Sequence, residues 1–105
     1  MATATVHIEQ VGGYAGPARC FAIDPPFQGH SYVTAWVQPG FGDIQLPEVA
    51  LVPATETGAA AENSLKRRPG SFVLHEPPDT PERIEGAYWL ALLMLGGYEI
   101  ASGDA

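Results

Sequence analysis

The chain is poor in cysteine and in positive charge. Cys20 is the only cysteine among 105 residues, so the chain can form no internal disulfide. Five lysines and arginines stand against twelve aspartates and glutamates, which gives a formal net charge of −7. DNA, RNA and anionic lipid all bind to basic surfaces. We therefore expect no nucleic-acid partner, whereas a basic protein surface is a favoured partner.

A long apolar run is also lacking, and we expect no signal peptide. The longest apolar stretch, residues 87–95 (AYWLALLML), covers about half of the hydrocarbon core of a bilayer. Residues 1–10 have neither the basic segment nor the long apolar segment of a signal peptide. We therefore expect no membrane span and a cytoplasmic location.

What the chain does contain indicates a globular protein with short elements. Apolar residues make up 46% of the composition, which argues against disorder. Ten prolines and twelve glycines predict many turns. At this length about two thirds of the surface of the unfolded chain is buried on folding. We predict a single domain over residues 1–105.

The clearest element is a helix within residues 79–100. Thr80 is suited to cap its start, Pro81 fits the first helical position, and Glu82 favours the positive end of the helix dipole. Gly96 and Gly97 supply a residue that can adopt the left-handed conformation at a helix end. Helical spacing puts one apolar stripe on a predicted sheet, formed by Ile84, Ala87, Tyr88, Ala91, Leu92 and Leu95.

The same helix has a second apolar side. Its large side chains lie off the sheet-facing stripe and are Trp89, Leu90, Leu93 and Met94. One interpretation is that loops of the same chain cover them, as apolar clusters under long loops are common. The other interpretation is a subunit or partner interface, because contiguous apolar patches with aromatic anchors usually mark contacts.

Alternating apolar residues predict short strands before the helix and one after it. The segments are residues 3–11, 18–23, 31–38, 48–52, 71–74 and 98–100. Asp24, Pro25 and Pro26 are expected to end the second strand, because proline cannot donate to a ladder. Residues 59–67 are a candidate short helix. We predict an α+β fold, with an antiparallel sheet of about five short strands and one principal C-terminal helix packed on one face.

Candidate chemistry is sparse. Cys20 would need His30 or His75 as a base and Asp24 as the group that orients it, but a cysteine within a strand is usually a small buried apolar residue. His7, His30 and His75 with Asp24, Glu76 or Asp79 are a candidate metal group, but no pair of these histidines has the spacing of a known metal site. We predict no catalytic residue, no metal and no cofactor.

Charged residues form two groups. The acidic group recurs at three-residue intervals and consists of Glu76, Asp79, Glu82 and Glu85. It either complements the helix dipole or docks a basic partner. The basic group, Lys66, Arg67 and Arg68, is either a solvated loop or a contact for phosphate, carboxylate or a neighbouring subunit.

Phe27 lies in a rigid segment between two prolines and a glycine. An aromatic side chain held in this way loses little entropy on binding, which favours a partner anchor. Capping of the chain's own core is the alternative.

Three stretches resemble short uncharacterised proteins encoded by actinobacterial phages. They are IDPPFQGHSYVTAWVQPGFG, RRPGSFVL and GAYWLALLMLGGYEI. The resemblance implies a phage or prophage accessory protein, in the host cytoplasm or in the virion, and it assigns no site. We expect a non-enzymatic protein that binds a host factor or copies of itself, with virion decoration or assembly as an alternative. A small cysteine- or histidine-dependent enzyme is the alternative of another class.

Overall fold

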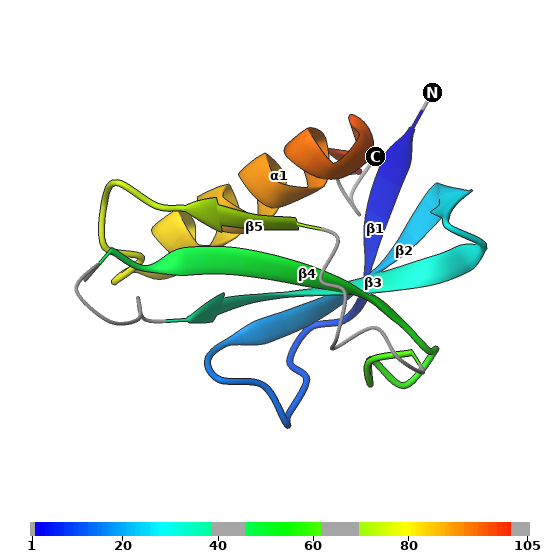
Figure 1. Cartoon of the computed structure of the whole chain (residues 1–105), viewed down its shortest axis with the longest axis horizontal. Helices are drawn as coiled ribbons and strands as arrows, with labels where there is room; N and C mark the ends of the chain where they lie inside the picture. The colour runs from blue at the N-terminus through cyan, green and yellow to red at the C-terminus, as the bar shows by residue number, and fades with distance from the viewer. Residues whose placement is uncertain (1, 39–45, 62–69, 102–105) are drawn as a thin grey trace.

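The computed structural model describes residues 2–38, 46–61 and 70–101, which form an α+β fold (Figure 1). One helix packs against a curled sheet of six strands, which confirms the predicted fold class. In chain order the elements are β1 (Thr3–Ile8), β2 (Ala18–Phe27), β3 (His30–Gln38), β4 (Glu48–Ala54), β5 (Gly70–Val73), α1 (Pro81–Gly96) and β6 (Glu99–Ile100).

The strands lie in the order β5-β4-β3-β2-β1-β6. Neighbours from β1 to β5 are antiparallel, as the short connections predict. The last strand, β6, instead pairs in parallel with β1, so the sheet is mixed. This follows from the path of the chain, because α1 carries it from the β5 edge over the sheet to the opposite edge (Figure 1).

One face of the sheet packs against α1 and forms the main core. Val33, Ala35 and Val37 alternate along β3 and all belong to this core. The Phe21 ring of β2 meets the Tyr88 ring of α1 edge-on, with ring centroids 6.0 Å apart. The apolar side chains that alternate along the strands therefore pack against the apolar stripe of the helix, as predicted.

The opposite face carries a second, smaller core under loops of the same chain. Trp36 of β3 is buried there, and the Tyr14 ring lies over it at a centroid distance of 4.9 Å. Tyr14 and Thr34 both donate their hydroxyl hydrogens to the carbonyl oxygen of Gly58, each at 2.8 Å. Both faces of the sheet are therefore covered, one by a helix and one by loops.

The predicted end of the second strand at Asp24 is wrong. β2 continues to Phe27, which pairs with His30 across the hairpin. The pairing of β2 with β3 shifts between Ala22 and Phe27, and both prolines lie in this irregular part. Proline is tolerated at such an irregularity because no ladder hydrogen bond is required of its nitrogen.

The predicted helix over residues 59–67 is wrong in its described part. Ala60 forms an isolated antiparallel bridge with Ala54, and Ala61 donates its backbone N–H to the carbonyl of Pro53 at 2.9 Å. Gly58, with a φ of 86°, supplies the left-handed residue of the reversal. The rest of that prediction, residues 62–67, lies outside the described residues, as do Lys66, Arg67 and Arg68.

Candidate protein-interaction surface

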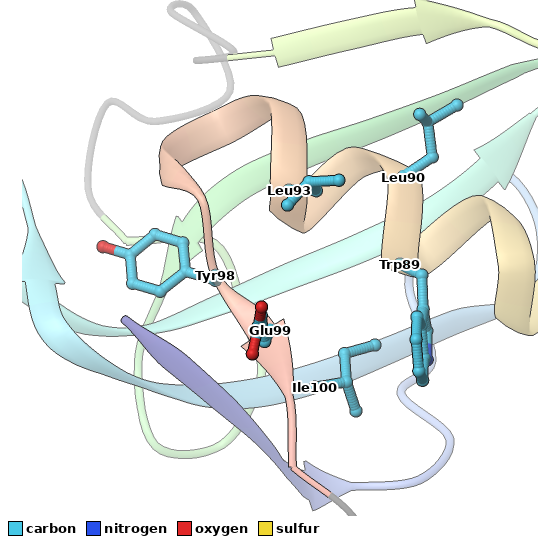
Figure 2. A pocket seen from close by; sticks show the side chains of 6 residues that line it. All are labelled: Trp89, Leu90, Leu93, Tyr98, Glu99 and Ile100. Carbon is cyan, nitrogen blue, oxygen red and sulfur yellow. The ribbon is translucent and has the colours of Figure 1, made fainter. Parts of the chain in front are cut away.

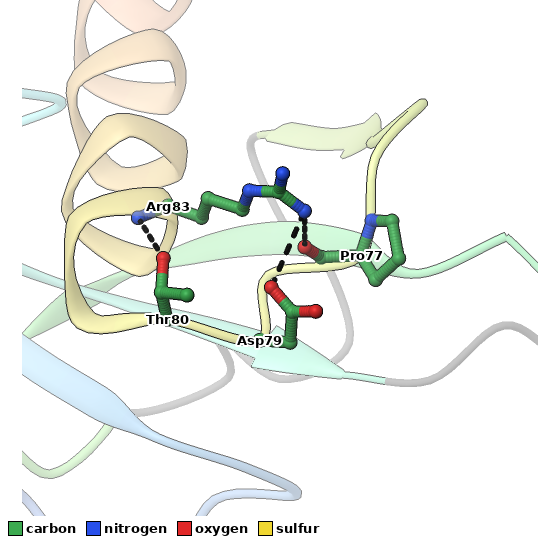
Figure 3. A network of polar contacts seen from close by, with 4 residues as sticks. All are labelled: Pro77, Asp79, Thr80 and Arg83. Carbon is green, nitrogen blue, oxygen red and sulfur yellow. Dashed lines mark hydrogen bonds and ion pairs between the residues drawn. The ribbon is translucent and has the colours of Figure 1, made fainter.

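The start of α1 is held by the predicted cap and by an arginine that the prediction did not include. The Thr80 hydroxyl accepts a hydrogen bond from the backbone N–H of Arg83 at 3.2 Å (Figure 3). The Arg83 guanidinium donates to the carbonyl of Pro77 and to the carboxylate of Asp79, each at 3.3 Å. These contacts join the lead-in segment to the first turn and fix where the helix begins.

The end of α1 is held by Gly97 and Tyr98. Gly97 adopts the left-handed conformation, with a φ of 71°, and donates its N–H to the carbonyl of Leu93 at 2.8 Å. The Tyr98 hydroxyl then donates to the carbonyl of Pro25 at 2.7 Å. Because both ends are anchored, the rotation of the helix about its own axis is fixed.

In this orientation one apolar side of α1 faces the sheet and the other faces away from it. The inner side is the predicted stripe: Ala87, Tyr88, Ala91 and Leu92 are buried, and Ile84 and Leu95 are half-buried. We call the other side the outer face and define it by four residues. Their exposed fractions are 58% for Trp89, 41% for Leu90, 55% for Leu93 and 61% for Met94. These side chains are therefore accessible to another molecule.

The outer face borders a groove that reaches the edge of the sheet. Trp89, Leu90 and Leu93 line a cavity of ≈ 410 Å³ together with Tyr98, Glu99 and Ile100 (Figure 2). The Trp89 ring stands beside the Ile100 side chain, so that α1 and β6 form the two walls. A groove of this kind combines apolar walls with one carboxylate, that of Glu99.

Two further hollows continue this surface toward the start of the helix. One, of ≈ 440 Å³, is lined by Glu82, Glu85, Gly86 and Trp89. The other, of ≈ 270 Å³, includes Gly86 and Leu90 in its lining. Trp89 and Leu90 each also border the apolar groove. The two further hollows therefore meet at Gly86, and each adjoins the apolar groove along α1.

The four residues of the acidic group are all exposed, but they have different surroundings. Asp79 is paired with Arg83, and the Glu85 carboxylate is 3.1 Å from the Arg19 guanidinium. Glu82 and Glu85 line the hollow beside Trp89, whereas Glu76 lines the hollow beside Leu90. Three of the four predicted acidic residues therefore border the hollows next to the outer face.

Arg19 is a contact residue that the sequence analysis did not identify. It projects from β2 to α1, where its guanidinium lies 5.3 Å from the centre of the Tyr88 ring and pairs with Glu85. It also donates to the carbonyl of Glu9 at 3.3 Å. The feature of the sequence that could have identified it is an arginine within an otherwise apolar strand. With three contacts inside the chain, Arg19 ties the first half of α1 to the sheet.

Phe27 lines none of the hollows beside the outer face. Its side chain is half-buried and packs against the helix-facing core. This position matches the core-capping interpretation, and we do not include Phe27 in the interaction surface.

Cys20 and the histidines do not come together. Cys20 is fully buried on the sheet face away from α1, and burial raises the pKa of its thiol, which the Thr34 hydroxyl lowers in part. It pairs with Thr34, and His30 lies four residues before Thr34 at the start of β3, about 13 Å along the strand. His7 donates from Nε2 to the carbonyl of Glu56 at 2.8 Å. Within residues 2–38, 46–61 and 70–101, no three histidine, cysteine or acidic residues are grouped to hold a metal ion.

Comparison with protein families, curated proteins and solved structures returned no match. Among the described residues, no helix has the length and apolar character needed to cross a membrane.

Proposed function

We propose that this chain is a non-enzymatic, phage-type accessory protein that acts by binding another protein through the outer face of α1. One observation carries the proposal: Trp89, Leu90, Leu93 and Met94 are contiguous on the helix and 41% to 61% exposed. Single exposed apolar residues are normal on a protein surface, but a contiguous patch with hollows beside it is typical of a contact site.

The composition of the patch supports the same proposal. Tryptophan is enriched among the residues that contribute most to binding, and Trp89 borders two of the three hollows. The partner is a host factor or a second copy of the chain, and the latter corresponds to an assembly or decoration role in the virion. The carboxylates of Glu82 and Glu99 beside the hollows favour a basic host factor over a second acidic chain, whereas Glu85 is already paired with Arg19.

Site-specific photocrosslinking tests this proposal. A photoreactive phenylalanine analogue is introduced at Leu93, on the outer face, and the matched control carries it at Thr57, which is exposed in the turn before Gly58. Both variants are produced in an actinobacterial host and irradiated in intact cells. We expect a discrete adduct from position 93 and none from position 57.

The mass of the adduct separates the two partners. Twice the mass of the chain indicates self-assembly, and sedimentation of the purified protein should then show an oligomer that Trp89→Ala dissociates. Any other discrete mass indicates a host protein. Equal, diffuse labelling from positions 93 and 57 contradicts the proposal, because it shows that the outer face has no preferred partner.

A further inference from the structure

The outer part of α1 consists of two rows of residues spaced four apart. One row is Glu82, Gly86, Leu90 and Met94, and the other is Glu85, Trp89 and Leu93. Side chains four residues apart form ridges on a helix, and the groove between two ridges receives the ridge of a second helix. Each row begins with a glutamate and becomes apolar farther along. A matching partner therefore has an apolar ridge with positive charge beside it.

Gly86 is not explained by the fold of this chain. It lies within α1, where glycine is less favourable than alanine, and a Cβ added to it would meet nothing within 4 Å. Gly96 is different, because a Cβ there would lie 2.8 Å from the Tyr98 ring. An exposed glycine inside a helix has a use where the backbone of another element must approach closely, because glycine has no side chain. Gly86 is also where the hollows meet.

The charges around the surface select the partner. Glu82 and Glu85 lie at one end of the apolar region, and Glu99 lies in the groove at the other end. Among the described residues, Arg83 is engaged with Asp79 and the Pro77 carbonyl. Arg19 is paired with Glu85, so Glu82 and Glu99 carry the rim's negative charge. A second copy would bring another net charge of −7 to this acidic rim. Lysine or arginine residues on the partner complement the rim instead.

We propose that the outer face binds an amphipathic α-helix of another protein, whose apolar ridge is flanked by lysine or arginine, and that this helix crosses α1 beside Gly86. This inference rests on the proposed protein-binding function and adds the chemistry and conformation of the partner. Packing of ridges spaced four apart predicts a crossing angle of roughly −50°. An extended strand added to the edge of the sheet is the weaker occupant, because β6 has two residues and offers few backbone hydrogen bonds.

A two-part peptide library provides the test. Half of its 20-residue peptides have apolar residues in a helical pattern, and half have them in the alternating pattern of a strand. In both halves lysine and glutamate are equally frequent at the remaining positions. The library is selected for binding to the full chain and counter-selected on the Trp89→Ala, Leu93→Ala double variant. We expect helical peptides rich in lysine to be enriched.

Two variants then test the geometry with the enriched peptides. Gly86→Ala should raise the Tm of the free protein by about 2 to 8 °C and still weaken peptide binding about tenfold, because the added methyl group occupies the crossing point. Glu82→Gln should weaken binding about threefold and lower the Tm by only a few degrees, through the lost interaction with the helix dipole. Fluorescence anisotropy and circular dichroism measure the two quantities.

The possible outcomes are distinct. Enrichment of strand-patterned or glutamate-rich peptides overturns the proposal, as does binding that Gly86→Ala leaves unchanged. Failure of any peptide to be enriched over the double variant also overturns it. If crosslinks from position 93 persist in these cases, the outer face is a contact site for a partner of another kind, and the proposed function stands. If the crosslinks are absent as well, both proposals fail.

Discussion

The inner and outer sides of α1 have similar apolar composition and opposite surroundings. Leu92 is fully buried against the sheet, whereas the next residue, Leu93, is 55% exposed. Both are leucines of the same helical turn, so their difference comes from position around the helix and from what packs there. The comparison shows that apolar character marks a side chain for contact, while the rest of the fold decides whether the contact is internal.

The largest expected effect separates these two leucines. Leu92→Ala should lower the free energy of unfolding by about 2 to 5 kcal/mol, because it leaves a cavity in the main core. Leu93→Ala is the matched control and should cost about 0.5 kcal/mol or less, since its side chain is largely solvated in the free protein. Urea unfolding followed by circular dichroism measures both values. Equal losses would show that the outer face is covered in solution.

The glycines of α1 provide a pair of changes with opposite sign. Gly97→Ala should destabilise the protein by about 1 to 2 kcal/mol, because its φ of 71° is unfavourable for a residue with a Cβ. Gly86→Ala should stabilise it by roughly 0.5 to 1 kcal/mol, because it is helical and faces open space. Thermal unfolding of both variants checks the signs. A destabilising Gly86→Ala would mean that the inner fold, and not a partner, requires this glycine.

The N-terminal cap of α1 should make an intermediate contribution to the free energy of unfolding. Thr80→Ala removes the acceptor for the Arg83 N–H and should cost about 1 kcal/mol. Thr80→Ser keeps a hydroxyl and is the control, with an expected change of a few tenths of a kcal/mol. The same urea titration measures both, and an equal loss in the two variants would contradict the capping role.

The smallest expected effect is a pH dependence on the inner side. Burial raises the pKa of Tyr88, although the nearby Arg19 guanidinium lowers it in part. A folded pKa above the unfolded value of about 10 means that this contribution is complete below pH 10 and is lost as the pH rises through the folded pKa. Tyr88→Phe should therefore lose less stability than the natural chain between pH 9 and about pH 11. Parallel curves for the two proteins would disprove this contribution.

The inner side was predictable because its signals are local. The cap at Thr80, the proline at Pro81 and the apolar spacing from Ile84 to Leu95 all act within a few residues of each other. The same holds for β3, where alternation placed Val33 and Trp36 on opposite faces. The resemblance to phage proteins and the inferred partner remain predictions.

The failures involve contacts between distant parts of the chain. Pro25 and Pro26 lie within β2 because the hairpin with β3 is irregular there, which no local pattern indicates. Residues 59–61 follow the turn at Gly58 and meet β4 instead of forming a helix, because Ala60 finds Ala54 there. Arg19 lies far from Glu85 in the chain, so their ion pair appears only in the folded protein.

The limits of α1, its apolar stripe and the alternation of the strands follow from residue order, because hydrogen bonding in a helix turn and side-chain alternation in a strand are short-range properties. Packing between distant segments determined the rest. It joined β6 to β1 in parallel, covered the second face of the sheet with loops and turned Phe27 toward the core. It also left Trp89 and Leu93 exposed, because the sheet can cover only one side of a helix that lies on its surface.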